Sequence, residues 1–170
     1  VRSLHAGAAA TRQEQAIERL TELATTGRID DHQVLVWGDR MPGSPAEART
    51  DAALFALNRV AVFTEWANRN GLAVERFEHA EVESRLLGER HRTVTVPIMT
   101  LAEDEGRDLR FVAPVSGPDG AVRVLDRLDQ LAGETEPATE YEPLARTYAE
   151  PPRGVALAPP EAEERSGRNA

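Results

Sequence analysis

The sequence predicts an α/β fold over residues 1–133, with helices on both faces of a mixed sheet of four or five strands. Segments with helical spacing alternate with short apolar runs in the first half of the chain, which favours parallel strands joined by helices. The continuous apolar run at residues 33–37 is typical of a central strand. A hairpin further along the chain, at residues 93–114, adds an antiparallel pair.

The chain begins with a short expected strand at residues 1–5, followed by a helix. Thr11 and Glu14 have the spacing of a capping box, in which each side chain bonds a free amide of the first turn. Ile17 opens a series of apolar residues with helical spacing, and Gly27 suits the end of the helix.

A second, longer helix is predicted after the central strand. Ser44 and Glu47 form a second capping box, and Pro45 falls at the first helical position. The apolar residues that follow have helical spacing as far as Gly71, where we expect the helix to stop. Residues 72–77 then predict another strand.

The second half of the predicted domain holds a hairpin and a last helix. Residues 93–102 and 108–114 predict antiparallel strands, and the apolar spacing over residues 122–131 predicts an amphipathic helix. Residues 81–92 are compatible with a short helix or with one arm of a hairpin that turns at Gly88.

The composition changes after Gly133. Residues 134–170 hold six of the eleven prolines and eight glutamates, and they lack apolar periodicity. Paired prolines break helices, and so polar a segment buries little apolar surface. We therefore divide the chain into one α/β domain, residues 1–133, and a disordered acidic tail, residues 134–170, that packs on nothing.

The composition also excludes several function classes. Having no cysteine excludes disulfides, thiolate metal sites and dithiol redox chemistry. The net charge of −9 disfavours strong nonspecific binding to nucleic acid, which needs concentrated positive charge. No apolar run is long enough to span a membrane and no signal peptide opens the chain, so we expect a cytoplasmic protein that is not bound to a membrane.

The order of these elements resembles the thioredoxin-like fold over nearly all of residues 1–133. Trp37 ends the central strand ahead of a loop and a long helix, where that fold carries its active site. Val96 and Pro97 open the hairpin where that fold has a cis-proline, so the resemblance implies a cis peptide bond between them. A ferredoxin-like α+β sandwich is the alternative fold.

Met41 and Ser44 stand where thioredoxins carry the redox dithiol, and neither residue can form a disulfide. Any activity retained with this fold is therefore the binding of an extended peptide or a small ligand in the groove beside the proline. The residues expected to line that groove are Trp37, Arg40, Met41, Ser44 and Pro97.

A second resemblance rests on several stretches taken together. In combination they resemble a group of small haloarchaeal proteins classed as helix-turn-helix domain proteins, which implies a haloarchaeal cytosol and a role in transcription. The stretches are residues 1–4, 12–13, 32–38, 46–50, 96–99 and 111–114.

A DNA-binding function would use the best basic cluster of the chain, Arg85, Arg90 and Arg92. On a hairpin these side chains could act as a wing against the phosphate backbone. The long predicted helix is a poorer DNA reader, because ten-residue spacing turns its arginines to different faces. Those arginines are Arg49, Arg59 and Arg69.

The sequence holds no motif that identifies an enzyme. We find no metal-binding histidine pair, phosphate-binding loop or nucleophile elbow, so we expect no catalytic residue, no metal and no cofactor. The main hypothesis is a non-catalytic cytosolic regulatory domain, thioredoxin-like and redox-inactive, that binds a protein partner or a small ligand. The alternative is a DNA-binding transcriptional regulator, and either protein could form a homodimer.

Overall fold

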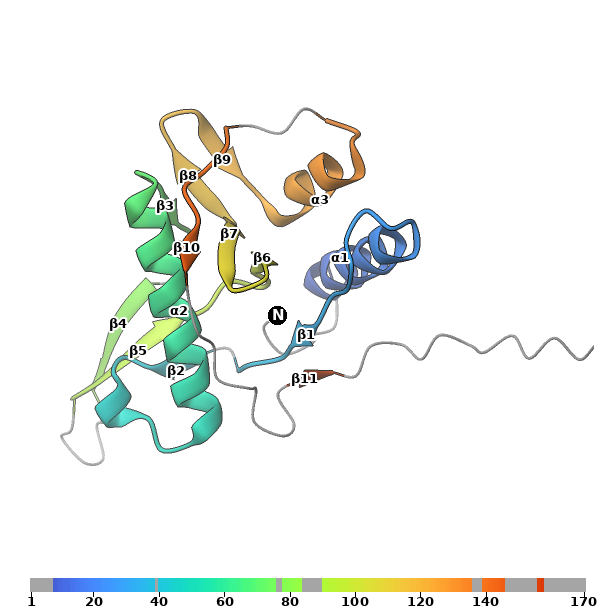
Figure 1. Ribbon diagram of the computed structural model, residues 1–170. Coiled ribbons are helices and arrows are strands. Elements are labelled where there is room, and N and C mark those ends of the chain that lie inside the picture. The colour runs from blue at the N-terminus through green and yellow to red at the C-terminus, as the bar shows by residue number, and fades with distance from the viewer. Residues whose placement is uncertain are drawn as a thin grey trace, which may run out of the picture.

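The computed structural model is of mixed α/β class, as predicted, and it describes residues 8–38, 40–75, 78–83, 90–135, 139–145 and 156–157. Figure 1 shows two helices side by side on one side of the central strands and the third helix on the other side. The helices are α1 (Ala8–Thr25), α2 (Asp51–Arg69) and α3 (Val124–Ala132), of which α1 and α3 are the neighbours.

The strands form small sheets, and every described pairing is antiparallel. One sheet has the order β2 (Arg40–Pro42), β5 (Arg90–Thr95), β4 (Glu78–Glu83). A second has the order β10 (Leu144–Ala145), β7 (Asp108–Ala113), β6 (Leu101–Glu105). A third has the order β3 (Ala73–Val74), β8 (Val115–Gly117), β9 (Gly120–Val122), and β1 (Val34–Leu35) pairs with β11 (Ala156–Leu157).

These pairings differ from the single mixed sheet that we expected. The described strands form neither a thioredoxin-like sheet nor the single sheet of a ferredoxin-like sandwich. β6 and β7, like β8 and β9, are joined by two-residue turns, which allow only antiparallel pairing. The apolar run at residues 33–37 is not a central strand, because it contributes only two strand residues and these are half-buried.

The helices begin at other residues than the capping boxes predicted. α1 starts at Ala8, so Thr11 lies inside it. Ser44 precedes only a single 3-10 turn, η1 (Pro45–Glu47), and the chain is extended again at Ala48. The N-cap of α2 is Thr50, whose Oγ1 accepts a hydrogen bond of 3.2 Å from the amide of Ala53.

α2 spans two hydrophobic clusters. The C-terminal half of the helix packs into the larger one, where the Trp66 ring lies edge-on to the rings of Phe111 and Tyr141 with centroids 5.5 and 5.6 Å apart. Its N-terminal half contributes Ala56 to the smaller cluster. We call these the large core and the small cluster; the buried members of the small cluster are Met41, Ala56, Val94 and Val96.

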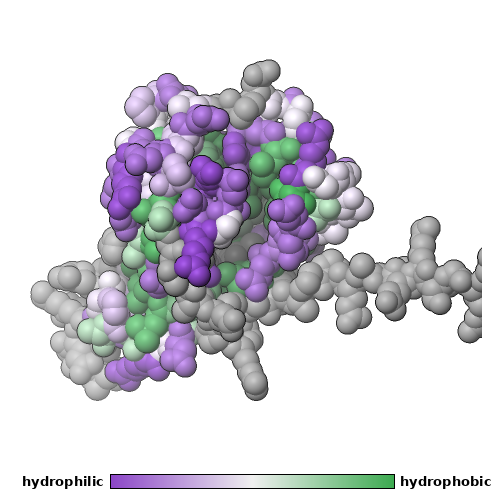
Figure 2. Space-filling model, in the orientation of Figure 1, coloured by the Kyte–Doolittle hydropathy of each residue, from purple (hydrophilic) through white to green (hydrophobic). Residues whose placement is uncertain are grey.

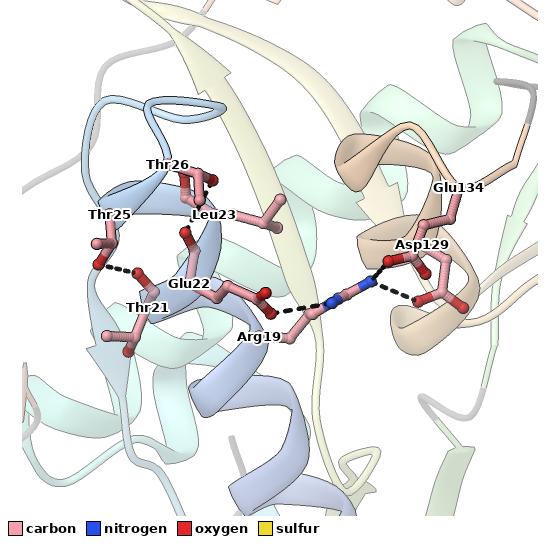
Figure 3. Close-up of polar contacts among 8 residues, drawn as sticks. All are labelled: Arg19, Thr21, Glu22, Leu23, Thr25, Thr26, Asp129 and Glu134. Atoms are coloured by element: carbon pink, nitrogen blue, oxygen red, sulfur yellow. Dashed lines mark hydrogen bonds and ion pairs between the residues drawn. The ribbon is translucent and has the colours of Figure 1, made fainter.

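Polar contacts join α1 to the rest of the molecule. Figure 3 shows Arg19 of α1 between Glu22 of its own helix and Asp129 and Glu134 of the α3 end. Hydrogen bonds to Glu134 and then Glu22 raise the pKa of Arg19 above its ordinary value. The Gln13 side chain is buried and donates a 2.8 Å hydrogen bond to the carbonyl of Ile98.

Part of the expected tail belongs to the core, so the expectation that it packs on nothing is wrong for residues 139–145. Leu144 is only 5% exposed, and Tyr141 packs on the large core. The side-chain amide of Asn70 donates to the Glu142 carbonyl at 3.0 Å and accepts from the Glu142 amide at 2.7 Å. Apart from β11, the rest of the tail after residue 145 lies outside the described residues.

The cis peptide bond joins Ala113 to Pro114, so the expectation of a cis bond between Val96 and Pro97 is wrong. β5 ends at Thr95, two residues before Pro97. Pro97 therefore removes no hydrogen bond from a strand ladder and needs no special accommodation there.

Candidate nucleic-acid interface

A helix and a hairpin form a separate unit around the small cluster. η1 and α2 are joined by residues 48–50, and α2 packs on β2 and β5 of the sheet that also contains β4. Figure 1 shows the hairpin of β4 and β5 beside the N-terminal half of α2. We call this arrangement of residues 40–69, 78–83 and 90–95 the helix–hairpin unit.

The exposed face of α2 is mostly uncharged. Leu54, Asn58 and Ala61 are exposed and follow the spacing of one helix face, and Asn68 continues it two turns later. The charged residues of this surface include Glu65 and Arg69, which form an ion pair of 2.7 Å with each other. By contrast, the exposed surface of α1 presents glutamates, namely Glu14, Glu18 and Glu22.

The arginine cluster lies on a hairpin, which settles the choice left open for residues 81–92. β4 and β5 pair antiparallel, and the residues directly opposite Arg90 and Arg92 are Glu83 and Glu81. The two facing pairs carry opposite formal charges, so the paired strands have no excess of positive charge at these register positions. Arg85 falls in the connection, outside the described residues.

The residues expected to line a peptide groove do not share an open surface. Met41 is 6% exposed and packs beneath α2, and Pro97 is buried as well. Ser44 is half-buried ahead of η1, and Arg40 takes part in β2 opposite Thr95. Trp37 is half-buried and packs against both clusters, and the rest of its side chain lines a cavity.

The cavity that Trp37 lines has a volume of about 720 Å³ and was not predicted from the sequence. It lies between the three helices, β6 and the segment at residues 28–35. In Figure 2 the face toward the viewer is hollowed near its centre, with hydrophilic residues around the hollow. The sequence signal for it was the apolar run at residues 33–37, in which Val34, Leu35 and Trp37 are half-buried and line this cavity.

The described parts of the chain contain neither a cluster of metal-ligand side chains nor a membrane-spanning helix. In these parts no three His, Asp or Glu residues gather as they would around a metal ion. None of the described helices combines the length and apolarity needed to cross a membrane.

Comparison with known proteins gave one match. A family model described as a helix-turn-helix domain matches residues 1–136, which is most of the chain. No curated protein and no solved structure matches the sequence.

Proposed function

This chain belongs to the helix-turn-helix domain family whose model spans residues 1–136, and from that premise we propose that it is a DNA-binding regulator of transcription and not an enzyme. The match over residues 1–136 is the observation that carries the proposal. We therefore favour DNA binding, the alternative hypothesis from the sequence, over ligand binding in a peptide groove, because the groove residues Met41 and Pro97 are buried.

The helix–hairpin unit is the part of the chain that fits this function. A helix-turn-helix needs two helical segments joined by a tight turn, with the second exposed to the major groove. In the unit a single 3-10 turn, η1, stands in the place of the first helix, and α2 follows it after residues 48–50. The β4–β5 hairpin next to α2 takes the place of a wing against the DNA backbone.

The exposed face of α2 carries side chains that can distinguish bases. An asparagine such as Asn58 can bond both N6 and N7 of adenine, and the methyl group of Ala61 can contact thymine. Leu54 and Ala61 are seven positions apart, or about 10 Å along the helix, which matches roughly three base pairs. Exposed Arg49 stands at the N-terminal end of α2, where free amides favour a phosphate.

The charge of the protein limits how it can bind. A chain of net charge −9 is repelled by bulk DNA, so we assign most of the affinity to specific base contacts. Apart from buried Arg59 and ion-paired Arg69, the arginines of the unit and of the connection between β4 and β5 are Arg40, Arg49, Arg85, Arg90 and Arg92. Five phosphate contacts at most predict a logarithmic salt slope no steeper than about −4.5.

The test is selection of sites by the full chain from a random duplex DNA library, followed by fluorescence anisotropy on the enriched sequence. Asn58→Ala is expected to lose roughly 5- to 100-fold in affinity for that sequence and little for others. Arg49→Ala is expected to weaken binding to all sequences alike, because a phosphate contact carries no sequence information.

Arg107→Ala is the matched control, since Arg107 is exposed in the turn between β6 and β7 and outside the helix–hairpin unit. Its binding should equal that of the unaltered protein. A palindromic enriched site would indicate a homodimer. Failure to enrich any sequence, or equal losses in the Asn58 and Arg107 variants, would overturn the proposal.

A further inference from the structure

α1 covers one side of the cavity and buries little apolar surface elsewhere. Its residues Ala16, Ile17 and Leu20 line the cavity, so part of the apolar side of the helix faces open space. Atoms beside such a space lose the close contacts that a packed core would give them. Among the side chains described for α1, the buried apolar ones are Ala16 and Leu23, whereas α2 buries Phe63 and Trp66 as well as several smaller residues.

α3 is the main neighbour of α1. Of the described helices and strands, it alone makes more than slight contact with α1. The other described attachment of α1 is the hydrogen bond from Gln13 to the Ile98 carbonyl. Elements with few buried apolar contacts open at a lower free energy than the core of the protein. We therefore expect the hold of α1 on the molecule to depend strongly on its contacts with α3.

Arg19 makes the polar part of that contact. One terminal nitrogen of its guanidinium donates to Glu134 and lies 3.8 Å from Asp129, while the other donates to Glu22 of its own helix at 2.9 Å (Figure 3). The Arg19 side chain is only 24% exposed, so its interactions are screened by water less than those of an open surface pair. Several carboxylates around one arginine form a network, which is worth more than an isolated pair.

The two elements that Arg19 joins are both acidic. The exposed or half-exposed carboxylates concerned are Glu14, Glu18 and Glu22 of α1, Asp129 of α3, and Glu134 just after α3. Carboxylates that bond one guanidinium lie within the screening length of about 10 Å at roughly 0.1 M salt, so they repel one another when that cation is removed. Arg28 also reaches the backbone at Gly133, which leaves one cation near the end of α3 and makes the expected repulsion partial.

We propose that α1 is a lid over the cavity and that Arg19 is the latch that holds the lid on α3. With Arg19 in place α1 stays closed; without it α1 opens as a unit while the sheet of β7 and the buried part of α2 stay folded. Opening admits water and small solutes to the space that Ala16, Ile17 and Leu20 cover. The proposal stands apart from DNA binding, because it rests on α1, α3 and the cavity.

The experiment compares two full-length variants by hydrogen exchange and mass spectrometry at low salt. Arg19→Gln removes the cation, so the amides of α1 should exchange roughly two- to fivefold faster while those of β7 stay unchanged. Arg12→Gln is the matched control, because Arg12 is exposed on the same helix and the variant removes the same charge two turns away. Its exchange should equal that of the unaltered protein.

Access to the cavity is measured by acrylamide quenching of tryptophan fluorescence. The sequence has two tryptophans, and Trp66 is fully buried whereas Trp37 lines the cavity, so quenching reports mainly on Trp37. Acrylamide is neutral, so a change in protein charge does not alter its approach. Arg19→Gln should raise the quenching constant and Arg12→Gln should not.

Salt separates an electrostatic latch from a loss of side-chain packing. In Arg19→Gln, molar KCl screens the remaining repulsion, so exchange in α1 should slow toward that of the unaltered protein. Glu134→Gln added to Arg19→Gln should slow it as well, because it removes one of the repelling carboxylates. A defect in packing alone would respond to neither change.

Thermal melts recorded by circular dichroism show whether each variant is folded. If Arg19→Gln does not fold, Arg19→Lys carries the comparison with a smaller expected effect, because it keeps the charge but offers one nitrogen in place of two. Equal exchange in the Arg19 and Arg12 variants, or acceleration that extends to β7, would overturn the proposal. Faster exchange in α1 with unchanged quenching would show that the helix frays without opening the cavity, and would overturn it too.

Discussion

The two hydrophobic clusters along α2 differ greatly in size. Among the residues whose side chains the structure describes, the large core has fourteen buried members, drawn from all three helices, several strands and the C-terminal segment, and the small cluster has four. Stability follows buried apolar surface, so the large core fixes the fold, and the described side chains of the helix–hairpin unit contribute less. The surface proposed to bind DNA therefore lies on the part of the molecule with the smaller described core.

The largest expected effect comes from the centre of the large core. Trp66 is fully buried between Phe111 and Tyr141, so Trp66→Ala should lower the free energy of unfolding by about 4–5 kcal/mol. Urea denaturation followed by circular dichroism measures the loss. A decrease below about 1 kcal/mol would show that the two clusters do not differ in the way described.

Removal of the C-terminal segment should have the next largest effect. A chain that stops at residue 138 loses buried Leu144, the Tyr141 ring contacts and the bonds between Asn70 and Glu142, at a cost of about 3–4 kcal/mol. A chain that stops at residue 145 keeps them and should lose about 1 kcal/mol or less. Equal melting curves for the two would contradict the placement of residues 139–145 in the core.

Val94→Ala tests the small cluster. Val94 is 2% exposed and faces Met41 across the strands, and loss of two methyl groups should cost about 2 kcal/mol. Hydrogen exchange should then quicken in β5 and the first half of α2 while the amides of β7 stay protected. Equal acceleration in β7 would mean that the unit does not open separately from the large core.

The smallest expected effect compares two arginines. Arg127 makes a two-point contact with Glu103 and lies 4.3 Å above the Phe111 ring, so Arg127→Gln should cost about 1 kcal/mol. Arg69→Gln breaks an exposed pair with Glu65 and should cost about 0.3 kcal/mol. Thermal melts of the two variants, run side by side, measure the difference, and a larger shift for Arg69→Gln would contradict it.

Local signals predicted the elements that depend on neighbouring residues. The turn after Asp104 predicts a hairpin, which is present as β6 and β7. The expected single strand at residues 93–102 is wrong, because β5 ends at Thr95 and β6, in another sheet, begins at Leu101. The apolar spacing from Val122 to Leu131 predicts α3. Gly71 ends α2 with φ of 67°, as its permissive backbone suggests. The turn, α3 and the end of α2 are confirmed, because turn and helix signals act over a few residues.

Contacts between distant residues could not be predicted in the same way. Nothing near Glu142 in the sequence shows that its backbone pairs with Asn70, and nothing near Ile98 shows that Gln13 bonds it. The cavity arises because α1, α2 and α3 meet around Trp37 and Thr100, so it too depends on tertiary packing. The arginines of the hairpin were predicted, but the glutamates opposite them appear only once the strands are paired.

One side of α2 faces the cavity and the other faces solvent, and this arrangement has a consequence for regulation. Phe63 lines the cavity, while Asn58 and Ala61 of the same helix face solvent and the proposed DNA. A molecule in the cavity and a DNA duplex on the outer face would therefore both contact α2 and both affect its position. Thermodynamic linkage requires the influence to be mutual: whatever factor a bound molecule applies to DNA affinity, bound DNA applies to the affinity for that molecule.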